Sequence, residues 1–206
     1  MIKKIMPAII IAAILWFFMF SPWTKDYLNF WLGMSVSAGI LSFMGLYIQR
    51  KNIKELFNFK LSHIYIGIAS AIALYLIFYI GNYISKIIFP FAPTEVNNIY
   101  NNKVQANYII ISLLLLFWIG PAEEIFWRGF VQYNFLKKYS ALTSLITSSI
   151  IYSLVHIWSF NFMLVMAALV CGLFWGYLFN RYRSIIPVLV SHSIWDFLIF
   201  ILIPIS

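Results

Sequence analysis

The sequence predicts an all-α fold, a polytopic bundle of about seven transmembrane helices. Of its 206 residues, 63% are hydrophobic and only 10% are charged, whereas a soluble domain carries about 25% charged residues. Apolar runs of roughly 20 residues, the length that a helix needs to cross a bilayer, alternate with polar or basic residues. They cover residues 5–23, 27–48, 64–85, 106–136, 141–158, 162–180 and 184–205. We expect one transmembrane domain over residues 1–206 in a lipid bilayer.

The lysine and arginine residues between these runs predict that the N-terminus lies in the cytoplasm. With this orientation, the cytoplasmic side carries most of the basic residues, as the positive-inside rule requires. They are Lys3, Lys4, Arg50, Lys51, Lys54, Lys60, Lys137, Lys138, Arg181 and Arg183, against Lys25, Lys86 and Lys103 on the opposite side. Because the basic residues are scattered in short pairs, the net charge of +8 does not indicate a nucleic-acid partner.

The first three runs, within residues 5–85, carry no recognisable motif, and we expect them to be non-catalytic spans. Between the second and third runs, residues 49–60 are expected to form a short interfacial helix. His63 follows this segment and is expected to lie at the surface. The Asn-rich segment 89–105, which contains two prolines, is expected to be a loop.

The last four runs, residues 106–205, contain six ionisable side chains and are expected to form the catalytic core. These side chains are Glu123, Glu124, Arg128, His156, His192 and Asp196. Ionisable groups at bilayer depth cost several kcal/mol each on insertion scales, so they usually pair with one another and face a protein interior or a wet cavity. The sequence therefore predicts an active-site cavity within the membrane.

Spacing divides these groups into pairs. Glu124 and Arg128 are four residues apart on a helix, which favours an ion pair. His192 and Asp196 have the same spacing, which lets the carboxylate orient the imidazole. Glu123 points about 100° away from Glu124 around the helix, so it is free to contact something other than the arginine. The alternative is that the first three charges only lock their span to a neighbour.

An interruption is expected in the fourth run at Gly120 and Pro121, because proline cannot donate the helical hydrogen bond of its position. A kink or a new helix start is predicted there. If Pro121 begins a helix, Glu123 and Glu124 fall in its first turn, where free backbone amides favour a carboxylate.

Three segments resemble the motifs of a membrane protease family. E-E-I-F-W-R at 123–128, Y-S-L-V-H at 152–156 and H-S-I-W-D at 192–196 are similar to E-E-x-x-x-R, F-x-x-x-H and H-x-x-x-N/D. These are the motifs of the CAAX-protease and bacteriocin-processing family, also called the CPBP or Abi family. Their order, separations and membrane setting agree with that family. The resemblance implies an intramembrane endopeptidase that acts on a membrane-associated peptide or protein.

The resemblance also implies roles for individual residues. Glu123 would be the general base, and His156 would help it to activate water. His192 and Asp196 would lie on the oxyanion side, supported by the Glu124–Arg128 ion pair.

Two departures from the family pattern have chemical consequences. Tyr152 replaces the usual phenylalanine and would add a hydroxyl to the site. Asp196 stands where an asparagine is common, and an ionised carboxylate cannot donate to an oxyanion. Asp196 therefore either stays protonated or orients His192, and we favour the orienting role.

Counting along straight helices from the cytoplasmic ends gives an incomplete alignment of these residues. Glu123 and Asp196 reach depths of about 20 and 18 Å, whereas His156 and His192 reach about 24 and 12 Å. Helix tilt, the break at Gly120 and Pro121, or Pro187 near the start of the last run would have to bring the histidines to the depth of the carboxylates.

Other functions compete with this interpretation. Two histidines and two carboxylates could hold zinc, but no H-E-x-x-H is present, so we expect no cofactor. Cys171, the single cysteine, is expected to be a buried small hydrophobe. One alternative is a non-catalytic bacteriocin-immunity or peptide-binding protein of the same fold. Another is a proton-coupled transporter, which the lack of an inverted repeat disfavours.

Composition also bears on localisation and substrate. The chain is rich in Ile, Asn, Lys, Phe and Tyr, which fits an AT-rich bacterial genome. We therefore expect a bacterial plasma membrane. Leader peptides, peptide pheromones or bacteriocins are then favoured over prenylated CAAX proteins as substrates.

Overall fold

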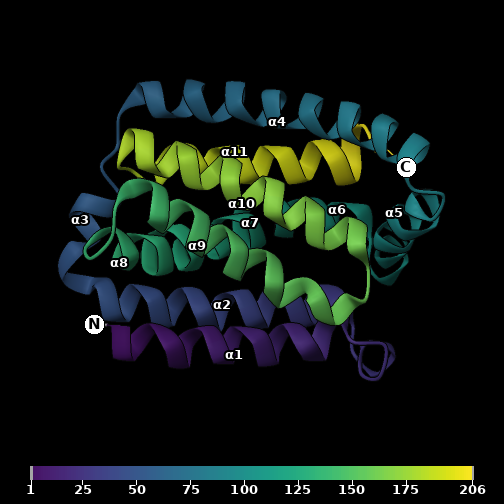
Figure 1. Cartoon of the computed structure of the whole chain (residues 1–206), viewed down its shortest axis with the longest axis horizontal. Helices are drawn as coiled ribbons and strands as arrows, with labels where there is room; N and C mark the ends of the chain where they lie inside the picture. Colours follow the sequence, from purple (N-terminus) through teal and green to yellow (C-terminus); the bar gives the residue numbers. More distant parts are fainter. Residues whose placement is uncertain (1, 206) are drawn as a thin grey trace.

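A computed structural model describes residues 2–205, with side chains described from residue 5, and it contains no strand in this range. The predicted all-α fold is confirmed. Figure 1 shows the helices side by side in a bundle, with α3 and α8 at one end and α5 at the other. The helices are α1 (Ile2–Phe20), α2 (Phe30–Gln49), α3 (Ile53–Leu56), α4 (Leu61–Ile88), α5 (Ala92–Tyr100), α6 (Tyr108–Leu114), α7 (Gly120–Phe126), α8 (Tyr133–Leu136), α9 (Ala141–Leu154), α10 (Phe162–Tyr182) and α11 (Ile186–Phe197).

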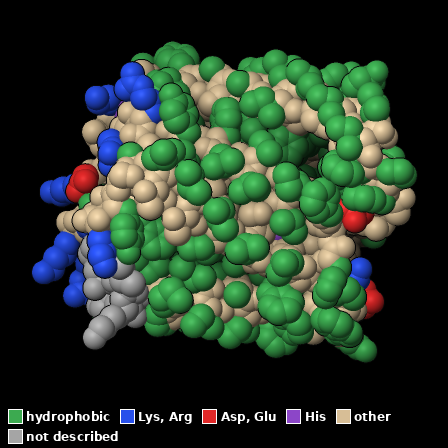
Figure 2. Space-filling view, in the orientation of Figure 1, with side chains coloured by type: hydrophobic (Ala, Val, Ile, Leu, Met, Phe, Trp, Pro, Cys, Tyr) green, Lys and Arg blue, Asp and Glu red, His purple; other side chains and the backbone are tan. Residues whose placement is uncertain are grey.

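Seven helical segments correspond to the seven predicted runs. Five are long and apolar enough to cross a membrane: Phe30–Leu56, Leu61–Ile88, Tyr108–Leu136, Ala141–Ser159 and Phe162–Tyr182. Two shorter apolar segments, Ile5–Phe20 and Ile186–Leu202, complete the set. Apolar side chains cover the flank of the bundle seen in Figure 2, as expected for a surface that faces lipid. The chain is a multi-pass membrane protein.

Helix α7 lies near the centre of the bundle. It packs against α2 on one side and α11 on another, and α4 covers α11. Helix α10 packs against α9, and α1 packs against the 3₁₀ turn Val155–Ser159 that follows α9. Figure 1 shows α9 and α10 running obliquely to α2 and α11. Depths counted along straight parallel helices therefore do not apply to residues on these oblique segments.

Basic side chains gather at one end of the bundle, shown on the left of Figure 2. We call it the basic end, and its described members are Arg50, Lys51, Lys54, Lys60, Lys137, Lys138, Arg181 and Arg183. Its connections are held together, because the Ile185 N–H donates to the Leu56 carbonyl at 2.9 Å and the Tyr133 hydroxyl donates to Glu55 at 2.8 Å. The side chains of Lys3 and Lys4 lie outside those described. The positive-inside rule assigns the basic end to the cytoplasm.

Two local predictions between the spans are wrong. His63 was expected at the surface, but it is only 3% exposed and lies edge-on to Tyr182, because α4 begins two residues earlier and includes it in a packed first turn. The expected loop 89–105 instead contains α5 and the 3₁₀ turn Asn101–Gln105. Pro93 lies at the start of α5, where the first backbone N–H groups have no acceptor within the helix, so the N–H that proline lacks is not needed. The short helix expected within 49–60 is present as the 3₁₀ turn Arg50–Asn52 followed by α3, and its position at the membrane interface stays a prediction.

The predicted interruption at Gly120 and Pro121 is replaced by a change of helix type. Residues Leu115–Ile119 and Trp127–Gln132 form π-helical turns on either side of α7, and the backbone stays helical through Gly120. Proline has no backbone N–H to donate, and a π turn lets the helix continue past such a position. The predicted first turn with free amides therefore does not form, and the glutamates of α7 need other partners.

Gly120 also sets how closely α7 approaches α11. A Cβ at this position would lie 3.3 Å from the backbone N and Cα of Ser193 and 3.1 Å from the Leu115 carbonyl. Only glycine leaves room for this contact. The approach places the first motif beside His192.

Candidate active site

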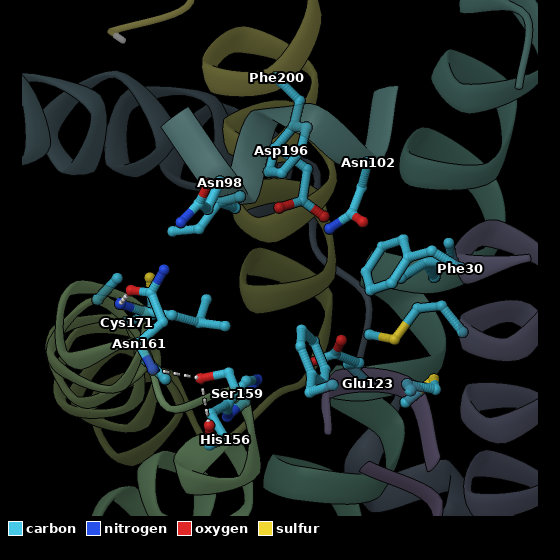
Figure 3. A pocket seen from close by; sticks show the side chains of 18 of the residues that line it. Phe30, Asn98, Asn102, Glu123, His156, Ser159, Asn161, Cys171, Asp196 and Phe200 are labelled. Atoms are coloured by element: carbon cyan, nitrogen blue, oxygen red, sulfur yellow. Dashed lines mark hydrogen bonds between the residues drawn. The ribbon is translucent and has the colours of Figure 1, made fainter. Parts of the chain in front are cut away.

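A cavity of about 570 Å³ lies inside the bundle and is lined by all four residues predicted to be catalytic. Glu123 comes from α7, His156 from the turn after α9, and His192 and Asp196 from α11. Their side chains are buried, with exposures of 4% to 7%. Figure 3 shows Glu123, His156 and Asp196 around this space. The three motifs therefore meet in space despite their unequal distances from the helix ends.

The predicted ion pair between Glu124 and Arg128 is present. Arg128 Nη1 donates to Glu124 Oε1 at 2.6 Å, and both side chains are almost fully buried. Arg128 Nη2 donates to the carbonyls of Cys171 and Gly172 at 3.4 Å each. The guanidinium thus joins α7 to α10. Neither Glu124 nor Arg128 lines the cavity, so their position agrees with a supporting role.

Two aromatic rings enclose the same arginine. Arg128 Cζ lies 4.8 Å from the centre of the Tyr152 ring and 5.5 Å from that of Trp175. Such cation–π contacts stabilise a desolvated guanidinium. Trp175 also stacks on His192, with ring centres 3.8 Å apart and an interplanar angle of 21°. One tryptophan therefore contacts both the ion pair and the histidine of the third motif.

His192 is held between two carboxylates. Its Nε2 lies 3.4 Å from Asp196 Oδ2, as the four-residue spacing predicted. Its Nδ1 lies 2.7 Å from Glu124 Oε1, a contact that spans 68 residues of sequence and was not predicted. Both ring nitrogens face carboxylate oxygens, so the orientation of the ring is fixed. Glu124 Oε1 is thereby shared between Arg128 and His192.

Glu123 contacts Tyr152, the residue that replaces the family's phenylalanine. The Tyr152 hydroxyl donates to Glu123 Oε2 at 2.9 Å. This is the additional hydroxyl that the sequence led us to expect. Glu123 Oε1 has no hydrogen-bond partner among the described residues, and the side chain lines the cavity. One carboxylate oxygen is therefore anchored while the other can meet a molecule in the cavity.

His156 has a partner from the first span. Trp16 of α1 is fully buried and donates its Nε1–H to His156 Nε2 at 3.1 Å. Because an indole nitrogen can only donate, Nε2 is the acceptor, and the proton sits on Nδ1, which lies 2.8 Å from the Tyr152 carbonyl. His156 makes no direct hydrogen bond to Glu123 in the described chain. Tyr152 lies between them and contacts both.

Trp16 is a residue that sequence reasoning missed. The first run was expected to be non-catalytic, and a tryptophan in an apolar run carries no motif. One signal was present in the sequence. Tryptophan is enriched at membrane interfaces, so a tryptophan inside an apolar run, such as Trp16, is unusual and could have been singled out. Trp175 was missed for the same reason. Cys171 is buried as predicted, and it also lines the cavity.

The side chains of the cavity do not form an evident metal site. Among the described residues, no three His, Cys, Asp or Glu side chains are arranged to hold a metal ion. His192 and Asp196 are close together, but Glu124 does not line the cavity and is paired with Arg128, and Trp16 donates to Nε2 of His156. The donor set of a typical zinc site is therefore not assembled here.

Comparison with known families agrees with the motifs. Residues 105–198 match the family model described as Type II CAAX prenyl endopeptidase Rce1-like. The matched segment runs from just before α6 to just beyond α11 and contains the six ionisable residues that the sequence placed in the last four runs. No curated protein and no solved structure matches the chain. The family match confirms the resemblance to CAAX-type membrane proteases over this segment.

Proposed function

We propose that this protein is an intramembrane endopeptidase that hydrolyses a peptide bond in a membrane-associated peptide or protein. The observation that carries the proposal is Glu123, a buried carboxylate with one free oxygen on a cavity that it shares with His156, His192 and Asp196. The family model matched by residues 105–198 is described as Type II CAAX prenyl endopeptidase Rce1-like, which supports the reaction class. We place the protein in a bacterial plasma membrane.

In the proposed reaction, Glu123 acts as general base. Its free oxygen takes a proton from water, and the hydroxide attacks the carbonyl carbon of the scissile bond. The tetrahedral intermediate collapses as the C–N bond breaks, and Glu123 returns the proton to the leaving amine. The Tyr152 hydroxyl holds the other carboxylate oxygen at 2.9 Å and so fixes the direction in which the base points.

His156 assists this step in the proposal once its Nε2 is available. In the structure that nitrogen accepts from Trp16. Exchange of the Trp16 N–H for the reacting water gives the imidazole a direct role next to Glu123. Until this exchange, His156 positions Tyr152 through the backbone carbonyl at 2.8 Å.

Stabilisation of the oxyanion is assigned to His192. Its Nε2 lies 3.4 Å from Asp196 Oδ2, which is long for a hydrogen bond, so an N–H there is only weakly engaged and can be shared with a developing negative charge in the cavity. Asp196 orients the ring in this assignment. No cofactor takes part, and exhaustive chelation is expected to leave peptide cleavage unchanged.

The proposal is tested by comparing peptide termini in membranes from cells that carry the wild-type protein or Glu123→Gln at equal abundance. Termini that depend on the enzyme should disappear in Glu123→Gln. They should persist in Glu55→Gln, a matched change of a surface glutamate at the basic end. If no terminus changes with Glu123, the protease assignment is wrong. Retained bacteriocin immunity in a folded Glu123→Gln variant would then favour the non-catalytic alternative.

A further inference from the structure

The cavity of the candidate active site reaches only one end of the bundle. Its lining includes residues from three connections at the end where α5 lies, among them Lys25, Glu95, Asn98, Asn102, Gln105 and Asn161. No lining residue comes from the connections 50–60, 137–140 or 183–185 of the basic end. We call this opposite end the α5 end. Between the two ends of the bundle, the cavity lining therefore reaches the α5 end and not the basic end.

Charge assigns the α5 end to the outer face of the membrane. It carries Lys25, Lys86 and Lys103 together with Asp26 and Glu95, so its net charge is small. The basic end carries the excess of lysine and arginine that marks a cytoplasmic face. Figure 2 shows this contrast between the two ends of the bundle. The cavity therefore opens away from the cytoplasm.

The segment that borders the opening is held in place from three sides. Its Gln105 accepts from the Phe30 N–H at the start of α2 at 2.6 Å, and the Trp31 Nε1–H donates to the Asn102 carbonyl at 2.8 Å. Glu95 Oε2 accepts from the Met163 N–H of α10 at 2.9 Å. These contacts make α5 and the turn after it a fixed rim.

The C-terminal helix supplies the third attachment. The Tyr100 hydroxyl donates to the Ile199 carbonyl at 2.8 Å, and burial raises the pKa of Tyr100 to about 12, so the hydroxyl keeps its proton at neutral pH. Ile199 follows Asp196 by one helical turn. The rim is thereby joined to the element that carries part of the candidate active site.

This fixed rim carries amide side chains that form no hydrogen bonds with other described residues. Asn98, Asn101 and Asn102 line the cavity, and none of their side-chain amides makes a hydrogen bond within residues 5–205. Figure 3 shows Asn98 and Asn102 on either side of Asp196. An asparagine amide offers both a donor and an acceptor, which is the combination that an extended peptide backbone needs.

We propose that the α5 rim receives an extended peptide segment from the outer face of the membrane, with Asn98 and Asn102 binding its backbone. This inference rests on the proposed peptidase function. It identifies the substrate class as peptides or proteins whose scissile segment is exposed on the outer side, such as exported peptides or the outer ends of membrane spans. A cytoplasmic lipidated tail does not meet this opening.

Cysteine labelling tests the direction of the opening without any substrate. In a Cys171→Ala background, Asn98→Cys and Lys138→Cys are treated with a membrane-impermeant maleimide in intact cells. Asn98→Cys should be labelled in intact cells, whereas Lys138→Cys should be labelled only after permeabilisation, and the cysteine-free background should not react. Labelling of Lys138→Cys alone in intact cells, or of neither variant, would overturn the inference.

The positions of cleavage sites test the substrate class. Termini lost in Glu123→Gln should map to the outer side of substrate membrane proteins or to exported peptides. If they map to cytoplasmic segments, the outward opening is wrong while the peptidase function stands. If no termini depend on Glu123, the peptidase function fails, and the labelling result still decides which face the cavity opens to.

A matched pair of asparagines tests the binding role of the rim. The Asn98→Ala/Asn102→Ala double variant should lower the rate of cleavage of a Glu123-dependent substrate at limiting concentration by about tenfold, as loss of two backbone hydrogen bonds predicts. Asn97→Ala changes the neighbouring residue of α5, which does not line the cavity, and should have little effect. Equal rates in the double variant and Asn97→Ala would refute the binding role.

Discussion

Replacement of Arg128 by methionine should strongly destabilise the protein. Arg128 is 2% exposed and Glu124 is not exposed at all, so the change leaves a buried carboxylate whose one remaining polar partner among the described residues is His192. Methionine retains an apolar chain of similar length between the Tyr152 and Trp175 rings, so the loss is mainly electrostatic. Breaking a buried ion pair by removing one partner costs about 3–5 kcal/mol. We expect a decrease of this size in the free energy of unfolding.

The measurement is equilibrium unfolding in mixed micelles with sodium dodecyl sulfate as denaturant, followed by tryptophan fluorescence. Arg181→Met, which removes an exposed arginine at the basic end, is the control and should change the free energy of unfolding by less than about 0.5 kcal/mol. In the double variant Arg128→Met/Glu124→Gln, the buried charge is gone and the amide can still accept from His192. It should recover about 1–3 kcal/mol relative to Arg128→Met.

Two results would refute this reasoning. If Arg128→Met were as stable as Arg181→Met, the ion pair would contribute nothing to the fold. If the effects of Arg128→Met and Glu124→Gln simply added, the two side chains would not be coupled, and the 2.6 Å contact would not describe the protein in a membrane-like environment.

Three further changes probe contacts around the cavity. Trp16→Phe keeps an aromatic ring but removes the donor to His156 Nε2, so the nitrogen-15 resonance of this nitrogen should shift while Nδ1 keeps its proton on the Tyr152 carbonyl, and an unchanged spectrum would contradict the contact. Tyr152→Phe should lower the free energy of unfolding by about 1–3 kcal/mol because a buried carboxylate loses its donor, and unfolding equal to wild type would count against this. Gly120→Ala should reduce both cleavage and stability, because its Cβ would press on the α11 backbone. Gly81→Ala, whose Cβ would have no atom within 4 Å, should reduce neither, and equal unfolding curves for the two variants would contradict the close contact.

Contacts within one helix were predictable from the sequence, whereas contacts between helices were not. The Glu124–Arg128 and His192–Asp196 pairs follow from a four-residue spacing, because the geometry of an α-helix fixes which side chains are neighbours. The contact from Trp16 to His156 joins residues 140 positions apart. No local rule places α1 beside the turn after α9, so this part of the candidate site needed the structure.

Proline was the least reliable signal in the chain. Near 121 its missing donor was taken to interrupt a span, but a π turn absorbs the defect inside a continuous helix. In the segment 89–105, proline was taken to indicate a loop, but there it begins α5. A π turn before Pro121 and a helix start at Pro93 both tolerate a residue without a backbone N–H. Which of the two forms depends on packing: Gly120 packs tightly on α11, whereas α5 packs on α10.

Glu124 shows why the six ionisable residues do not divide cleanly into a supporting ion pair and a separate set of proposed catalytic residues. Its Oε1 lies 2.6 Å from Arg128 and 2.7 Å from His192, so one oxygen belongs both to the ion pair and to the proposed oxyanion side. Its Oε2 is buried without a partner, so both donors converge on the single oxygen Oε1. A displacement of Arg128 must therefore alter the orientation of His192 through this shared oxygen. The ion pair holds α7 in place, and through Glu124 it also sets the direction in which His192 faces the cavity.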